Sequence, residues 1–174
     1  MNFIRKHFLK FFLLMIAVVF SLAGCGPSPQ ERTIHLACQA LKAQDWEAFS
    51  KLTITEADFL IAENLRSGRG AESQFARNSL RPEQLQLLKE QFDQAIRGGD
   101  YCLDFSRCQY VFPTLNRTST RTTFSGEIVP VEEYILIIEM DGPERSAPGL
   151  GPNFLLVPWE DGYRIQALKF PHRS

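Results

Sequence analysis

The sequence has few cysteines and histidines, no excess of basic residues and no visible internal repeat. Its 174 residues include four Cys and three His, and no two cysteines form a close CxxC pair of the kind that binds zinc. The formal net charge is −1, whereas a nucleic-acid-binding surface needs a basic patch. We therefore expect no metal, no cofactor and no nucleic-acid partner.

The sequence also lacks an apolar run long enough to cross a membrane. Its apolar stretch begins at Phe11, becomes rich in small residues after Phe20, and follows a start that carries Arg5, Lys6 and Lys10 but no acid. A membrane-spanning helix needs about 20 apolar residues to cross roughly 30 Å of hydrocarbon. A basic start, a short apolar core and small residues at a cleavage site are instead the layout of a secretory signal peptide.

The motif Leu22-Ala23-Gly24-Cys25 follows this stretch and resembles the lipobox of bacterial lipoproteins. The resemblance implies that the Cys25 thiol receives a diacylglycerol, that the chain is cut before Cys25, and that the new amino terminus is acylated with a fatty acid such as palmitate. Two or more acyl chains hold a protein firmly at a membrane. Gly26, rather than Asp, follows the cysteine, and by the same resemblance this favours the outer membrane of the cell envelope, facing the periplasm.

The sequence therefore divides into residues 1–24 as a lipoprotein signal peptide, 25–29 as the lipidated cysteine with a short tether, and 30–174 as one domain. The length of the last part fits a single domain. A chain of that size buries about two thirds of the surface that it exposes when unfolded, so we expect it to fold without the anchor.

Helix signals dominate the chain up to about residue 99. Ser28 and Glu31 have the form of a capping box, in which two side chains bond the first free amides of a helix, and this helix should reach about Ala43. Thr55 with Asp58 repeats the pattern. The expected helix starts are Ser28, Asp45, Thr55 and Pro82, with a break in the segment 66–74 and a final end at Gly98-Gly99.

Residues that favour strands follow Asp100. The expected strands lie within 101–112, 117–129, 131–140, 153–160 and 162–170. Asp161-Gly162 predicts a tight hairpin turn. Ile137 should be buried, because apolar residues alternate on both faces of its strand. Helices followed by strands predict an α+β fold, with the helices packed on one face of an antiparallel, cone-like curved sheet.

Two segments, Ala37–Leu52 and Trp159–Phe170, are similar to the opening and the last hairpin of the ketosteroid-isomerase-like, nuclear-transport-factor-like cone superfamily. One departure is that no strand pattern is visible before Pro82. Isomerases of that superfamily use a carboxylate base and a polar oxyanion hole, but no motif here matches them. Asp104 alternates with apolar neighbours, as an outward-facing strand residue does, so no catalytic residue is assigned.

Apart from Cys25, the cysteines are Cys38, Cys102 and Cys108. On one straight strand the last two would lie about 20 Å apart, whereas a disulfide needs Cα atoms within about 7 Å. A disulfide between Cys102 and Cys108 therefore requires a turn between them. The alternative is two buried thiols.

The segment Asp141–Asn153 is rich in Gly and Pro and joins two expected strands. A loop of this length is often functional, and Arg145 and Leu150 would supply its polar and apolar contacts; the alternative is a mobile spacer. Two classes of function follow from the sequence. One is a non-catalytic, lipid-anchored binding or assembly module for an envelope protein or a small apolar ligand, and the other is a cone-fold enzyme acting on a small molecule. An enzyme should have an enclosed cavity with converging ionisable groups.

Overall fold

The computed structural model describes residues 26–97, 108–123, 126–140, 149–160 and 162–170. The helices are α2 (Pro29–Ala43), α3 (Trp46–Ser50), α4 (Glu56–Arg66), α5 (Gly70–Phe75) and α6 (Arg81–Arg97), with a π-helical turn η1 (Ala76–Leu80) between the last two. The strands are β1 (Cys108–Thr122), β2 (Ile128–Met140), β3 (Gly149–Leu150), β4 (Asn153–Trp159) and β5 (Gly162–Lys169). Helices precede strands, which confirms the predicted α+β class.

The helix starts agree with the local signals in the sequence. Ser28 and Thr55 each form a complete capping box, with Glu31 and Asp58 as the respective acidic partners. The Asp45 side chain accepts a hydrogen bond of 2.9 Å from the amide of Ala48 at the start of α3. Each signal needs only residues within three positions of one another, so no distant contact is required to form it.

The segment 66–80 differs from the expectation of a long break. α4 does end at Arg66, and Gly68 adopts a positive φ of 71°. However, helix resumes at Gly70 and continues through η1 into α6. The π turn ends at Leu80, two residues before Pro82, where the missing amide of proline would interrupt a regular helix. Pro82 therefore lies inside a longer helical segment and does not begin it.

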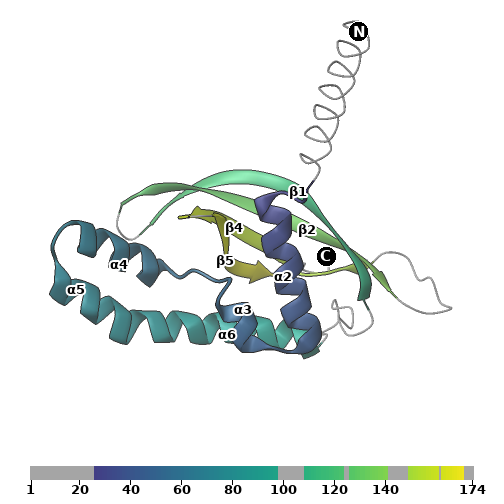
Figure 1. The fold of residues 1–174 in the computed structure, drawn as a ribbon, viewed down its shortest axis with the longest axis horizontal. Helices are drawn as coiled ribbons and strands as arrows, with labels where there is room; N and C mark the ends of the chain where they lie inside the picture. Colours follow the sequence, from purple (N-terminus) through teal and green to yellow (C-terminus); the bar gives the residue numbers. More distant parts are fainter. Residues whose placement is uncertain (1–25, 98–107, 124–125, 141–148, 161, 171–174) are drawn as a thin grey trace, which may run out of the picture.

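The antiparallel sheet has the order β1-β2-β4-β5, and β3 also pairs with β2. Among the described residues β1 and β5 do not meet, so the sheet is not closed. Thr53 adds an isolated parallel bridge to Ile165 of β5, where the sequence showed no strand pattern. Figure 1 shows the long β1–β2 hairpin arching over the helices.

Two sequence-based strand boundaries were wrong. The residues from Cys108 to Thr122 form one strand, with a bulge between Leu115 and Arg117, and do not divide into two. In the predicted loop 141–153, residues 149–150 form β3, whereas the expected strand start at Asn153 agrees with the start of β4. The β4–β5 hairpin was correctly predicted, but Gly162, expected in the turn, already pairs with Trp159, and the positive φ is found at Glu160.

The larger core lies between the sheet and helices α2, α3 and α6. Its strand residues include Tyr134, Leu136, Phe154 and Leu156. We call the sheet surface that carries them the α2 face. From the helices, Phe49 and Phe92 meet there with ring centroids 4.9 Å apart.

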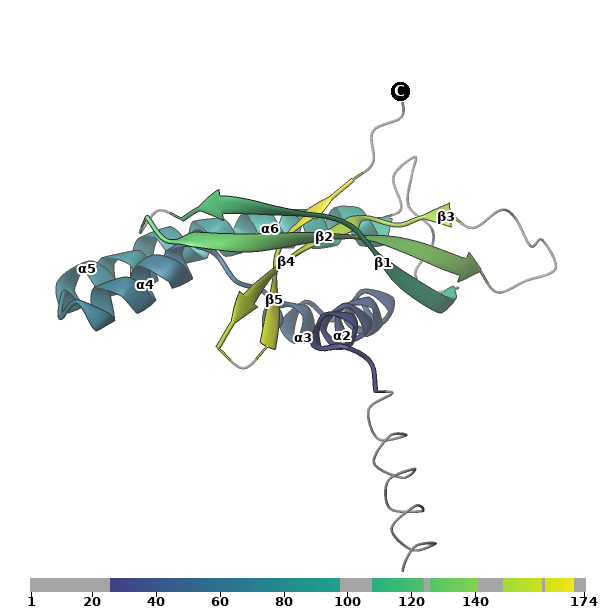
Figure 2. The same ribbon diagram turned by 90° about the horizontal axis from the view of Figure 1, so that it is seen from above.

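A smaller core lies on the opposite face, because neighbouring residues of a strand point to opposite sides. Ile54 and Phe59 pack there against Val129, Val131 and Val157. We call this surface the α4 face. In Figures 1 and 2, α4 and α5 project past the end of the β1–β2 hairpin.

Ile137 was wrongly predicted to be buried. Its neighbour Leu136 is 0% exposed on the α2 face, whereas Ile137 is 37% exposed. Ile137 lies on the α4 face, and among the described helices none covers that face at this end of β2. The strand is central, between β1 and β4, but on the α4 face its cover reaches Val129 and Val131 and not Ile137.

Candidate binding groove

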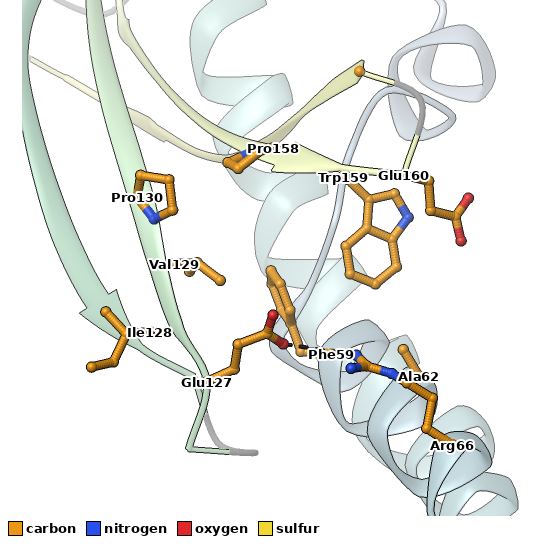
Figure 3. A pocket seen from close by; sticks show the side chains of 11 residues that line it. Phe59, Ala62, Arg66, Glu127, Ile128, Val129, Pro130, Pro158, Trp159 and Glu160 are labelled. Carbon is orange, nitrogen blue, oxygen red and sulfur yellow. Dashed lines mark ion pairs between the residues drawn. The ribbon is translucent and has the colours of Figure 1, made fainter.

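A half-open groove of about 470 Å³ lies between α4, the start of β2 and the β4–β5 hairpin. Figure 3 shows its lining side chains. The residues that line it are Phe59, Ala62, Arg66, Glu127, Ile128, Val129, Pro130, Pro158, Trp159, Glu160 and Gly162. Most of these side chains are apolar, and the volume lies within the usual range for small-molecule sites, about 300–1,000 Å³.

One wall of the groove is the side of α4 that carries Phe59, Ala62 and Arg66. Residues three and four positions apart lie on the same side of a helix, so this spacing brings the three side chains into one row. Phe59 is buried at the deep end, and the exposed Arg66 lies at the rim. The small side chain of Ala62 leaves space between them.

Ion pairs and hydrogen bonds hold α4 in place at its first turn. Arg81 of α6 lies 2.7 Å from the carboxylate of Asp58. On the sheet side, Arg121 of β1 lies 2.6 Å from Glu56, and Gln166 of β5 donates a 2.8 Å hydrogen bond to the same carboxylate. The wall is thus attached to another helix and to both edge strands.

The facing walls come from the ends of two hairpins. Trp159 ends β4 and meets Phe59 edge to face, with centroids 5.1 Å apart. Pro130 and Pro158, which have no amide hydrogen to donate, lie on β2 and β4. The result is a surface of rings and aliphatic carbon, as Figure 3 shows.

The charged groups of the groove lie among these apolar walls. Arg66 lies 3.8 Å from Glu127 across the rim (Figure 3), and Glu160 occupies the hairpin turn with a positive φ of 41°. An exposed ion pair of this kind contributes about 0–1 kcal/mol, so a ligand could displace it at little cost. The arrangement is suited to holding an apolar ligand, and its closest ionisable groups neutralise each other.

Outside the groove, a cluster of polar side chains lies on the α2 face around Glu132. Tyr134 and Tyr163 donate hydrogen bonds of 3.0 and 3.2 Å to its carboxylate, and Gln30 of α2 donates a third of 3.2 Å. Burial, and then the bond to Glu132, raise the pKa of Tyr134; burial and the charge of Glu132 raise the pKa of Tyr163. Both phenols therefore keep their protons at neutral pH. The cluster ties the start of α2 to the sheet.

Most residues that the sequence singled out lie outside the described ranges. These are Cys25, Cys102, Asp104 and Arg145. Cys108 begins β1, but its side chain is outside the description as well. Leu150 pairs with Ile137 across β3 and β2. Cys38 is buried in α2.

The sequence pattern did not indicate the groove. Phe59 and Trp159 were recognisable as apolar residues of a helix and a hairpin, but their contact joins positions 100 apart in the chain. The helical spacing of Phe59, Ala62 and Arg66 was the only local signal. It identifies one side of a helix without indicating what lies opposite.

Within the described ranges, no three His, Cys, Asp or Glu side chains are arranged so that they could hold a metal ion. None of the described helices is long and apolar enough to cross a membrane. Comparison of the chain with models of protein families, with curated proteins and with solved structures found no match.

Proposed function

We propose that this chain is a bacterial lipoprotein of the cell envelope whose domain is a non-catalytic binding module, and that the groove takes a small apolar ligand. The observation that supports this function is the groove itself. It combines a volume of about 470 Å³ with a lining of aromatic, proline and aliphatic side chains. Burial of apolar ligand surface there is favourable by about 25 cal/mol per Å².

The lipid anchor is proposed at Cys25, in the outer membrane with the domain facing the periplasm. The described chain begins just after this residue, and Gln30 is bonded to Glu132 at the middle of the sheet. Five residues span at most about 18 Å. An acylated Cys25 would therefore hold the domain close to the lipid surface, where apolar ligands are concentrated.

Filling the groove tests the proposal. Ala62→Phe adds a ring to the groove wall without removing a contact. The experiment uses a chain that begins at Ser28, with its fold checked by circular dichroism, and an uncharged apolar dye whose emission rises when it leaves water. In a Trp46→Phe background, Trp159 is the remaining tryptophan, and its fluorescence reports binding beside it. We expect dye binding by the parent chain and its loss in Ala62→Phe.

Ala71→Phe is the matched control, because it adds the same ring at an exposed position of α5 outside the groove. It should bind dye as the parent does. Equal dye binding by all three chains, or dye binding that leaves the Trp159 emission unchanged, would show that the groove is not the binding site.

A further inference from the structure

A second site lies on the α4 face, around a buried carboxylate. Glu133 of β2 is only 6% exposed. Four side chains from the three other long strands converge on it: Asn116 and Arg117 of β1, Asn153 of β4 and Lys169 of β5. None of these residues lines the groove, so the site is separate from it.

The two oxygens of Glu133 have different partners. Oε1 accepts hydrogen bonds from Asn153 at 2.8 Å and from Asn116 at 3.4 Å. Oε2 lies 3.0 Å from Nε of Arg117 and 3.7 Å from Nζ of Lys169. Neither cation has hydrogen-bonding geometry to Oε2, and this buried atom accepts no hydrogen bond within the described part of the chain. The two cations are therefore held beside Glu133 mainly by the attraction between their positive charges and the negative carboxylate.

The cluster carries more positive charge than its carboxylate requires. Burial opposes ionisation of Glu133, but the bond from Asn153 and the charges of Lys169 and Arg117 outweigh it and hold the pKa of this carboxyl below its usual value. Glu133 is thus ionised at neutral pH. One cation would neutralise it, and the second leaves the cluster with a net charge of +1.

The donors of both cations are accessible. The side chains of Arg117 and Lys169 are 59% and 48% exposed. Arg117 faces the carboxylate through Nε, so its terminal Nη groups are not used in that pair. The bulge between Leu115 and Arg117 locally changes the direction of β1, as bulges next to binding sites do. An arginine fork and a lysine ammonium are the donors that recognise phosphate and carboxylate groups.

We propose that Arg117 and Lys169 form a binding site for an oxyanion of the phosphate type. The Nη fork of Arg117 takes two oxygens of the anion, and Nζ of Lys169 takes a third. Glu133 is a positioning residue that keeps the two cations together despite their mutual repulsion. This site does not depend on the groove or on the nature of its ligand.

Phosphorus NMR titration of the full chain in detergent micelles tests the site, with inorganic phosphate in one arm and phosphatidylglycerol added to the micelles in the other. We expect saturable binding that weakens at least about tenfold in Arg117→Gln/Lys169→Gln, since charge-assisted bonds to the anion are lost. Arg77→Gln, at an exposed position of η1, is the control and should bind within about twofold of the parent. Binding of inorganic phosphate identifies a free anion as the ligand, and binding of the lipid alone identifies a headgroup.

Two further variants separate binding from a purely structural role. Arg117→Lys keeps the charge beside Glu133 but loses the fork, so phosphate should bind more weakly while the melting temperature is kept. In Arg117→Gln, adding Glu133→Gln should restore the melting temperature but not the binding. The proposal is overturned if neither probe binds the parent chain, if the double variant binds as the parent does, or if Glu133→Gln restores phosphate binding.

Discussion

Phe59 and Trp159 meet edge to face, with ring planes 85° apart and centroids 5.1 Å apart, although one lies on α4 and the other at the end of β4. This contact closes the deep end of the groove and joins α4 to the sheet. Aromatic pairs of this geometry contribute about 0.5–1.5 kcal/mol beyond the area that they bury. Together with the polar contacts at the first turn of α4, this pair sets the position of α4 and with it the shape of the groove.

Phe59→Ala should therefore destabilise the domain by about 3–5 kcal/mol, from lost transfer energy and the cavity left behind. Phe59→Leu, which keeps most of the volume, should cost less. Phe75→Ala is the control, because Phe75 is an exposed phenylalanine on α5 and should be close to neutral. Chemical denaturation measures all three. Similar losses for Phe59→Ala and Phe75→Ala would contradict the position of α4.

Leu136 and Ile137 offer a comparison between neighbouring residues of one strand. Leu136→Ala should cost about 2–5 kcal/mol, because the side chain is fully buried. Ile137→Ala should cost clearly less, because the side chain is partly solvated on the uncovered part of the α4 face. Thermal and denaturant unfolding of the two variants give the values. A larger loss for Ile137→Ala would mean that something covers this face.

The acid dependence of stability should change in Glu133→Gln. The pKa of Glu133 is below its usual 4.5 in the folded chain, so ionised Glu133 favours folding. That contribution is complete above the unfolded pKa of about 4.5 and is lost as the pH falls through the lower folded pKa. The difference in unfolding free energy between parent and Glu133→Gln should therefore shrink below about pH 4.5.

Glu90→Gln, at an exposed position of α6, is the control for the pH series. As an exposed surface substitution, it should change the unfolding free energy by no more than about 0.5 kcal/mol. A constant difference between parent and Glu133→Gln across the acid range would show that this carboxyl is not preferentially ionised in the folded state.

Lipidation is expected at Cys25, from the lipobox Leu22-Ala23-Gly24-Cys25. Metabolic labelling with a fatty-acid analogue should mark the parent chain and leave Cys25→Ala unlabelled, with the precursor retaining residues 1–24. Cys38→Ala is the matched cysteine control and should remain labelled. Equal label in parent and Cys25→Ala would refute acylation at this residue.

The elements that the sequence predicted well are those that depend on near neighbours. The capping boxes at Ser28 and Thr55 each bond backbone amides within three residues. Trp159 and Gly162, which pair at the start of the β4–β5 hairpin, are only three positions apart. Such contacts join near neighbours in the chain, so the sequence alone can indicate them. The α+β class followed from the same signals, because helix starts and strand patterns occupy separate parts of the chain.

The apolar alternation of β2 predicted a strand but not which side chains are buried. Leu136 and Ile137 are equivalent in that pattern, and only the placement of the helices makes one buried and the other partly exposed. Helices α2, α3 and α6 cover the face that carries Leu136, and these contacts join positions distant in the chain.

Both sites depend on tertiary structure for the same reason. The groove joins α4 to two hairpin ends, and the anion site joins Glu133 to residues on three other strands. In the sequence, Arg117 and Lys169 are ordinary charged residues of two expected strands. They lie beside one carboxylate because strand order and the bulge in β1 bring them there. Local sequence determines where helices and strands begin, whereas long-range pairing determines which of their side chains meet.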